Sequence, residues 1–211
     1  MSARYAVMLD VSRLAVLVVG GGEVALRKVR GLVEAGGRPE IVSPRVRPEL
    51  LEIIRAQGLT WREREWAVDG SGFDLVFAAT DSARVNGRVA REAAECGALC
   101  DVVDDPRLST LHVPATIRQD DVVVAFSTGG ASPLLARRLR ERLEAVVTPG
   151  LGRAARRLAR AREEVRTRWP HDGVRRREAW FNLVTPEFLD AAIEGRDDDV
   201  EHRISACLSQ S

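Results

Sequence analysis

The sequence predicts an α/β fold with a doubly wound parallel sheet, followed by a small α+β domain and a helical C-terminal domain. Short apolar runs alternate with amphipathic helical patterns up to residue 103, as parallel strands alternate with their connecting helices. The first apolar run ends in three glycines, at residues 20–22, immediately before a helical pattern. That order is typical of the first turn of a Rossmann-like sheet. The alternation stops after residue 106, so a different architecture is expected there.

The predicted strands of the sheet are short, and those at residues 14–19 and 73–79 are largely apolar, as strands buried on both faces are. They lie at residues 14–19, 39–43, 59–65, 73–79 and 99–103, with residues 5–9 as a further candidate at the sheet edge. The helices between them have apolar residues at helical spacing and lie at residues 23–35, 49–57 and 83–96. Gly36 and Gly97 follow two of these helices, where glycine commonly marks a helix end.

Beyond residue 112 the pattern predicts two further domains. Residues 113–117 and 122–127 are expected to pair as antiparallel strands, and a helix capped by Ser132 is expected at residues 134–147. The predicted domains are therefore 1–112 for nucleotide binding, 113–147, and 148–211, which is helical in pattern. The middle domain has too few elements to bury its own apolar faces. We expect it to be a dimerisation domain that pairs two copies as a homodimer.

Composition and charge exclude several classes of protein. The formal net charge is +1, which counts against a nucleic-acid-binding protein. No apolar run is long enough to span a bilayer and residues 1–5 show no signal-peptide core, so we expect no membrane partner and a cytoplasmic location. The three cysteines lack the spacing of a metal site, and we expect reduced thiols with no resident metal.

The glycine turn predicts a dinucleotide-binding site. Gly20, Gly22 and Ala25 fit the G-x-G-x-x-G/A spacing of the dinucleotide fingerprint. Gly20 allows the tight turn, Gly22 lets the backbone approach a pyrophosphate, and the small Ala25 lets the helix pack against the strand. The unpaired amides at the start of that helix would then hold the phosphates.

Polar residues follow the strands that point toward the expected ligand. Thr80 and Asp81 follow the strand at 73–79, and the strand at 39–43 ends in Ser43, which is followed by Pro44 and Arg45. NAD-binding units usually have an acidic residue at the end of the second strand to bind the ribose 2′-hydroxyl, and it is missing here. Arg45 could instead receive a 2′-phosphate, so these residues leave NAD and NADP open.

Asp104 and Asp105 follow the last strand of the sheet. Adjacent residues of an extended chain point in opposite directions, so at most one carboxylate faces the ligand. We expect it to be Asp104, because a carboxylate beside a cofactor can act as a general base. The alternative is an acidic turn without a chemical role, since Asp-Pro is common in turns.

Several stretches, spread in order over nearly the whole chain, resemble one known family. They are GGGEVALRK at 20–28, FAATDSARVN at 77–86, DVVDDP at 101–106, VPATI at 113–117, FSTGGASPLLARRLRERLE at 126–144 and RRREAWF at 175–181. With these motifs the chain resembles the precorrin-2 dehydrogenase/sirohydrochlorin ferrochelatase family, which comprises the N-terminal module of siroheme synthase and its stand-alone relatives.

The resemblance implies an NAD-dependent enzyme that oxidises precorrin-2 to sirohydrochlorin in siroheme or cobalamin biosynthesis. Some members also insert Fe²⁺ or Co²⁺, so either ion is a candidate substrate. The resemblance implies a homodimer with a Rossmann domain, a dimerisation domain and a helical domain. The family's catalytic aspartate corresponds to Asp104, and its NAD contacts correspond to Gly22, Glu23, Val24, Ser43, Pro44, Arg45, Thr80 and Asp81. The resemblance therefore favours NAD over NADP.

Arginines are the expected ligands of the tetrapyrrole substrate, because precorrin-2 carries many carboxylates. The candidates are Arg137 and Arg138, with Arg140 and residues 175–177 as further positions. Thr128 stands where siroheme synthase has a serine, and it keeps a hydroxyl that can touch the substrate. For most arginines of residues 153–168 we expect solvated surface charges, because they recur around more than one helix face.

Other functions stay open. The protein could be a dehydrogenase alone, with a separate chelatase. It could be an NAD-binding sensor module whose arginine-rich helices bind nucleic acid, although the near-neutral net charge counts against that. An oxidoreductase for another carboxylated substrate would bind NAD without consuming precorrin-2.

Overall fold

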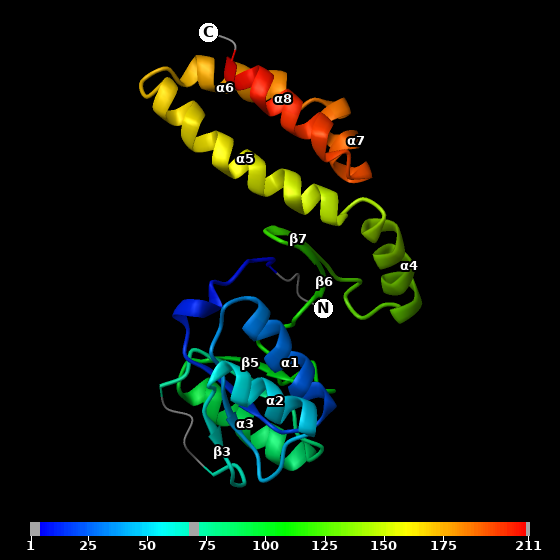
Figure 1. Ribbon diagram of the computed structural model, residues 1–211. Coiled ribbons are helices and arrows are strands. Elements are labelled where there is room, and N and C mark those ends of the chain that lie inside the picture. The colour runs from blue at the N-terminus through cyan, green and yellow to red at the C-terminus, as the bar shows by residue number, and fades with distance from the viewer. Residues whose placement is uncertain (1–4, 68–71, 210–211) are drawn as a thin grey trace. The chain divides into compact units, whose positions relative to one another are not determined.

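The computed structural model describes residues 5–67 and 72–209, and the chain forms two compact units (Figure 1). The first unit is Met1–Val113 and the second is Pro114–Ser211. Each unit buries apolar clusters of its own, as a compact domain does.

The first unit contains the predicted parallel sheet. Its strand order is β3-β2-β1-β4-β5, and every pairing is parallel. The strands are β1 (Val16–Val19), β2 (Glu40–Val42), β3 (Trp61–Arg62), β4 (Leu75–Ala78) and β5 (Leu99–Val102). The chain moves outward from β1 to β3 and then returns to the other side of β1, so the strand order reverses between β1 and β4. Ligands of such sheets bind at the carboxyl ends of the strands near this reversal.

Helices cover both faces of this sheet (Figure 1). α1 (Glu23–Glu34) and α2 (Pro48–Gln57) pack on one face, and α3 (Ala83–Glu95) packs on the other. Successive residues of β1 alternate between the two cores, with Val18 in the first and Leu17 and Val19 in the second. This burial on both faces is the reason why the strand sequence is apolar without interruption.

Two predicted strands differ from the structure. Residues 5–9 are exposed and form no strand. Asp10 instead accepts hydrogen bonds from Ser12 and starts a 3₁₀ helix at Val11–Arg13. The third strand is limited to Trp61–Arg62, whereas residues 59–65 were the expected range. Among the described residues β3 pairs only with β2, so no second strand there supplies hydrogen bonds that would extend it.

The second unit begins with the predicted antiparallel pair, β6 (Ala115–Gln119) and β7 (Val122–Phe126). Asp120 turns the chain between them with a φ of 54°, a left-handed conformation that aspartate tolerates. The next helix is α4 (Pro133–Glu144), where the Ser132 side chain accepts a hydrogen bond from the Leu135 amide at 3.2 Å. α4 ends before the predicted residue 147, because the Val146 amide bonds to the Leu143 carbonyl and tightens the last turn.

Four helices complete the described part of the second unit: α5 (Pro149–Arg168), α6 (Gly173–Leu183), α7 (Pro186–Glu194) and α8 (Asp197–Ser209). Their shared core contains small side chains such as Ala154 and Ala191 together with Leu183 and Phe188. Within residues 5–67 and 72–209, no helix combines the length and the apolar character needed to cross a membrane.

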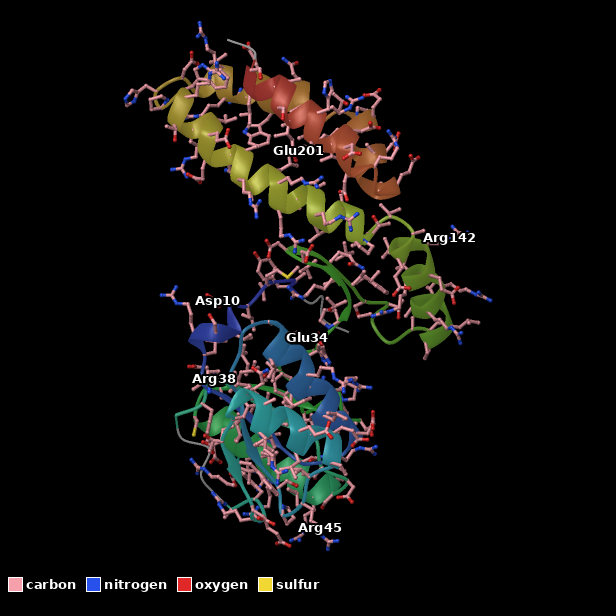
Figure 2. The ribbon with its side chains drawn as sticks, in the orientation of Figure 1. Asp10, Glu34, Arg38, Arg45, Arg142 and Glu201 are labelled. Carbon is pink, nitrogen blue, oxygen red and sulfur yellow. The ribbon has the colours of Figure 1, made fainter. Side chains whose placement is uncertain are left out.

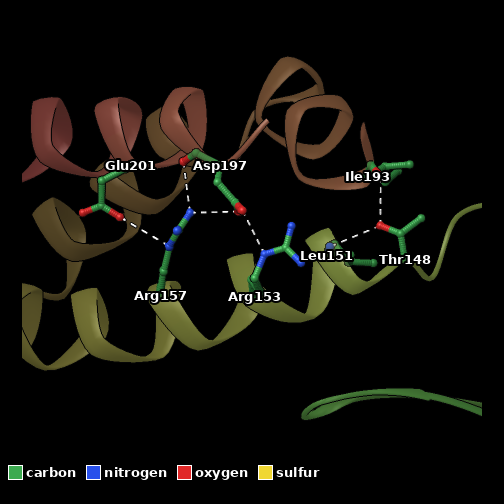
Figure 3. A network of polar contacts seen from close by, with 7 residues as sticks. All are labelled: Thr148, Leu151, Arg153, Arg157, Ile193, Asp197 and Glu201. Carbon is green, nitrogen blue, oxygen red and sulfur yellow. Dashed lines mark hydrogen bonds and ion pairs between the residues drawn. The ribbon is translucent and has the colours of Figure 1, made fainter. Parts of the chain in front are cut away.

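Ion pairs join the first half of α5 to α8 (Figure 3). The Arg153 Nε and Arg157 Nη1 atoms lie 2.9 and 3.1 Å from the Asp197 carboxylate, and Arg157 Nε lies 3.4 Å from Glu201. Arg156 pairs with Asp120 at 2.5 Å. These three arginines are 30–50% exposed and also form ion pairs within the unit, whereas the expectation of solvated charges concerned most arginines of residues 153–168.

Candidate functional site

The three glycines after β1 have different surroundings. Gly20 has a φ of 126°, and a Cβ on it would collide with the Ala79 carbonyl oxygen. A Cβ on Gly21 would collide with the Arg45 carbonyl oxygen. A Cβ on Gly22, by contrast, would meet no described heavy atom within 4 Å. Neighbouring strand ends therefore require the first two glycines, whereas Gly22 borders open space at the start of α1.

α1 begins at this turn without a side-chain cap among the described residues. Gly22 is the N-cap, and the Leu26 amide donates to its carbonyl at 3.0 Å. The amides of Glu23 and Val24 lie in the first turn, which has no intrahelical partners, and the helix dipole adds positive potential there. The exposed Glu23 carboxylate forms an ion pair with the Arg47 guanidinium at 3.4 Å. The arrangement is the one that binds pyrophosphate in Rossmann-like sheets.

The loop after β2 is shaped by Ser43. Its buried hydroxyl donates to the Arg45 carbonyl oxygen at 2.6 Å, and the Arg47 amide donates to the Gly21 carbonyl at 2.9 Å. Pro44 and Arg45 are exposed, and Figure 2 shows the Arg45 side chain at the surface of this unit. Ser43 therefore positions the loop against the glycine turn, and Arg45 presents its guanidinium to solvent.

The loop after β4 is held by Asn86. The Thr80 amide and hydroxyl donate to the Asn86 side-chain oxygen at 3.1 and 2.7 Å, and the Asn86 side-chain nitrogen donates to the Thr80 carbonyl at 3.0 Å. Asp81 follows as an exposed residue. Sequence reasoning missed Asn86, although its position three residues before the buried Val89 places it on the inward face of α3.

Asp104 lies in a tight turn after β5 and not on an extended chain. Its φ is 62°, so the expectation that Asp104 and Asp105 point in opposite directions does not apply. Left-handed backbone is uncommon for residues with a side chain, and such residues cluster at functional sites. Asp104 is exposed, and its carboxylate has no hydrogen bond or ion pair within residues 5–67 and 72–209.

Asp105 has a different environment. Its carboxylate accepts hydrogen bonds from the Arg107 Nε and Nη2 atoms at 3.0 and 3.1 Å. These side-chain hydrogen bonds lower the pKa of Asp105 below its ordinary value. Arg107 therefore occupies the Asp105 carboxylate, whereas the Asp104 carboxylate has no partner among the described residues and is the better placed of the two to meet a ligand.

The loop that carries these aspartates folds back along β5. The Val102 amide donates to the Ser109 hydroxyl at 2.9 Å, and the Cys100 amide donates to the Thr110 hydroxyl at 2.8 Å. These bonds pair the outer edge of β5 and close the loop that contains Asp104. Burial raises the pKa of Cys100 to about 11, so its thiol stays protonated and unreactive at neutral pH.

The single lysine of the chain forms a buried ion pair across the first unit. Lys28 Nζ on α1 lies 2.5 Å from the Asp101 carboxylate on β5, and the two side chains are 14% and 10% exposed. The ammonium also lies 5.4 Å from the centre of the Phe77 ring. The pair joins the helix that starts at the glycine turn to the strand that leads to Asp104. Its members are 73 positions apart, so no local sequence pattern indicates it.

We expect Lys28→Met to lower the free energy of unfolding by about 3–5 kcal/mol, because Asp101 would keep a buried carboxylate without its partner. The double variant Lys28→Met/Asp101→Leu removes both charges and should regain most of that loss. Urea unfolding of the two variants and the wild type measures the difference. Equal unfolding free energies for Lys28→Met and the wild type would contradict the prediction.

The residues predicted to bind the substrate lie in the second unit. Thr128 is half-buried in the loop before α4. Arg137 and Arg138 are exposed on α4, and both pair with Glu141, at 3.3 and 2.9 Å. The nucleotide-site residues and Asp104, in contrast, all belong to the first unit. Within the described ranges, no three histidine, cysteine, aspartate or glutamate side chains gather as the ligands of a metal do.

Two family models match the chain. The model described as "Putative NAD(P)-binding" matches residues 7–115, and the model described as "Sirohaem biosynthesis protein central" matches residues 124–145. The first match therefore contains the glycine turn, the loops after β2 and β4, and Asp104.

Curated relatives cover nearly the whole chain. The siroheme synthase of Nitrosomonas europaea is 36% identical over 207 residues, which are 97% of this chain and 43% of the relative. Siroheme synthase 1 of Aeromonas salmonicida is 40% identical over 194 residues, which are 92% of this chain and 41% of the relative. The chain thus spans about two fifths of the length of these relatives.

A solved structure named "SirC, precorrin-2 dehydrogenase" has the same fold. It matches with a TM-score of 0.78 at 25% identity, covering 96% of this chain and 100% of that chain. The predicted Rossmann-like sheet, antiparallel pair and helical region are therefore confirmed as one known architecture. The glycine turn, the uncapped start of α1 and the match over residues 7–115 together show that the chain belongs to the NAD(P)-binding family and is a relative of the siroheme synthases.

Proposed function

We propose that this protein oxidises precorrin-2 to sirohydrochlorin with NAD. The main observation behind the proposal is the Asp104 carboxylate, which has no partner in residues 5–67 and 72–209 and is held in a left-handed turn at the carboxyl end of an NAD(P)-binding sheet. The siroheme synthases and the precorrin-2 dehydrogenase that the chain resembles support this choice of reaction.

The residues of the first unit fit the demands of that reaction. Oxidation removes a hydride and a proton from the substrate, and a bound nicotinamide supplies the hydride acceptor. The amides of Gly22, Glu23 and Val24 would hold the pyrophosphate, with Gly20 forming the turn that presents them. Asp104 would accept the proton, because its carboxylate is exposed and engaged by no described residue.

The loops after β2 and β4 would complete the cofactor site. Ser43 and Pro44 would position the chain beside the adenosine half, and Arg45 would lie next to it. Thr80, fixed by Asn86, and the exposed Asp81 would border the site at β4. The glycine turn lies between these loops, because β1 pairs with both β2 and β4.

We expect the enzyme to use NAD in preference to NADP. Arg45→Asp would place an acid after β2, where it can accept hydrogen bonds from the ribose hydroxyls and repel a 2′-phosphate. The ratio of kcat/KM for NAD over NADP should therefore rise by about tenfold or more in this variant, a change of about 1.4 kcal/mol. Steady-state kinetics with each cofactor measures it, and a wild type that prefers NADP would contradict the cofactor assignment.

The substrate would meet α4 and the loop before it. Thr128 offers a hydroxyl, and Arg137 and Arg138 offer guanidinium groups that carboxylates bind well. Both arginines share Glu141 at the surface, and such exposed pairs are weak. An incoming polycarboxylate can therefore compete with Glu141 for them.

An anaerobic assay tests the proposed reaction against its alternatives. Purified protein with precorrin-2 and NAD should form NADH and sirohydrochlorin together. NAD binding without consumption of precorrin-2 would favour a sensor module or another carboxylated substrate. Adding Fe²⁺ or Co²⁺ to sirohydrochlorin then decides whether the same protein inserts metal, and no insertion would assign it dehydrogenation alone.

We further propose that residues 113–147 form the dimerisation domain of a homodimer and that residues 148–211 form the helical C-terminal domain. α4 has no buried residue, and its Leu134 and Leu135 are 64% and 56% exposed. Exposed leucines grouped on a short helix favour contact with another protein surface.

Sedimentation velocity should show a dimer at micromolar concentration, and Leu134→Arg should shift it toward monomer because a charge would be buried at the interface. A matched substitution of the exposed Val174 on α6, Val174→Arg, should leave the dimer intact. A monomeric wild type would refute the proposal.

A further inference from the structure

A pocket of the second unit lies between α5 and α6. It has a volume of about 640 Å³, within the range of small-molecule sites. The side chains that matter for its chemistry are those of Arg162, Glu163, Arg166, Arg176, Arg177 and Trp180. We call it the α5–α6 pocket.

Positive charge exceeds negative charge in the α5–α6 pocket. Four guanidinium groups line it, against the single carboxylate of Glu163. Glu163 lies 3.4 Å from Arg166, so it compensates one of the four. Arg162 and Arg177 have no hydrogen bond or ion pair within the part of the chain that the structure describes. A concave surface lined by one sign of charge concentrates ions of the opposite sign.

The pocket has a fixed frame. Arg176 Nη1 donates to the Trp169 and Pro170 carbonyl oxygens, each at 2.7 Å, so this arginine is anchored on the turn between the two helices. Trp180 packs against the core of the unit on one side and lines the pocket on the other. Its ring therefore provides a flat apolar wall beside the cations, a surface that suits a planar ligand.

These arginines differ from those in the first half of α5. Arg153 and Arg157 are engaged by Asp197 and Glu201, as Figure 3 shows. In that half, carboxylates of α8 pair with Arg153 and Arg157. In the second half, Arg162 has no such partner in the described residues. The contacts described for the unit therefore account for Arg166 and Arg176 but not for Arg162 and Arg177.

We propose that the α5–α6 pocket binds a polycarboxylate with a planar ring system. Guanidinium groups bind carboxylates in bidentate pairs, and several such groups around one pocket favour a ligand with several carboxylates. The choice of a carboxylated macrocycle rests on the proposed function, whose substrate and product have this chemistry. A free small polycarboxylate offers the same charged groups without the ring.

Uroporphyrin, a stable macrocycle with carboxylates on every pyrrole ring, is the probe for the proposed ligand. Citrate is the probe for the alternative, a small polycarboxylate without a ring system. Binding of each to the full chain is measured by fluorescence or calorimetry at two salt concentrations. Arg162→Gln and Arg177→Gln should each weaken uroporphyrin binding by about tenfold, as loss of a charged hydrogen-bonding partner does. The affinity should also fall with salt, because the pocket is open to solvent.

Arg160→Gln is the matched control. Arg160 is exposed on the same helix but does not line the pocket, and its variant loses the same charge. Its affinity for uroporphyrin should equal that of the wild type. Equal losses in Arg160→Gln and Arg162→Gln, or none in Arg162→Gln and Arg177→Gln, would overturn the proposal. Tight binding of citrate with loss in the same variants would keep the pocket and assign it to small polycarboxylates.

The test separates the pocket from the proposed reaction. A wild type that binds uroporphyrin through Arg162 and Arg177 but does not oxidise precorrin-2 would reject the reaction and keep the pocket. A wild type that oxidises precorrin-2, with both arginine variants binding uroporphyrin normally, would keep the reaction and reject the pocket.

Discussion

Asp104→Asn is expected to lower kcat for precorrin-2 oxidation by about 10²- to 10⁴-fold while NAD binding and the melting temperature stay unchanged. The substitution removes the proton acceptor but keeps the size of the side chain. Asparagine also tolerates the left-handed backbone at this position, where φ is 62°. Alanine is a poorer choice, because left-handed backbone costs it roughly 1–2 kcal/mol and would mix a folding defect with the catalytic one.

Asp105→Asn is the matched control for this experiment. Asp105 is the neighbouring carboxylate, but Arg107 engages it and lowers its pKa. Its variant should therefore keep most of the wild-type kcat. Anaerobic single-turnover kinetics, with NADH formation followed directly, measures both variants. If Asp104→Asn turned over at the wild-type rate, Asp104 would have no part in proton transfer. The main support for the proposed function would then be removed.

Gly22→Ala and Gly21→Ala should separate cofactor binding from folding. A Cβ at residue 22 would meet no described atom within 4 Å, and its φ of −85° suits any residue, so the fold should be unchanged. That Cβ would occupy the space in which a pyrophosphate approaches the α1 amides. We expect the affinity for NAD to fall by about tenfold or more, which corresponds to about 1.4 kcal/mol.

Gly21→Ala should instead destabilise the protein. The added Cβ would collide with the Arg45 carbonyl oxygen, and the loop after β2 would have to move away from the glycine turn. Overpacking of this kind typically costs about 1–3 kcal/mol. Thermal unfolding and NAD titration of both variants give the comparison. Full NAD affinity in Gly22→Ala would show that the nucleotide does not approach this turn.

The sheet and its nucleotide turn could be predicted because their signals are local. β1 is apolar on both faces, α1 repeats its apolar residues at helical spacing, and the glycines lie between them. Each signal depends on neighbours a few positions away, so it can be read along the chain. The strand ends were less predictable, since β3 stops where its single partner β2 no longer supports it.

The sequence by itself therefore determined the fold class, the glycine turn and the position of Asp104 after the last strand of the sheet. The tertiary structure decided how these residues are held. Asp104 lies in a left-handed turn, and the neighbouring Asp105 is hydrogen-bonded to Arg107. Thr80 is hydrogen-bonded to Asn86, and Lys28 forms an ion pair with Asp101. The physical reason is distance along the chain: a pair such as Lys28 and Asp101 meets only after α1 has packed on the sheet. Helical and strand periodicities do not predict contacts between residues far apart in the sequence, because these hydrogen bonds and ion pairs depend on which groups the packed elements bring together.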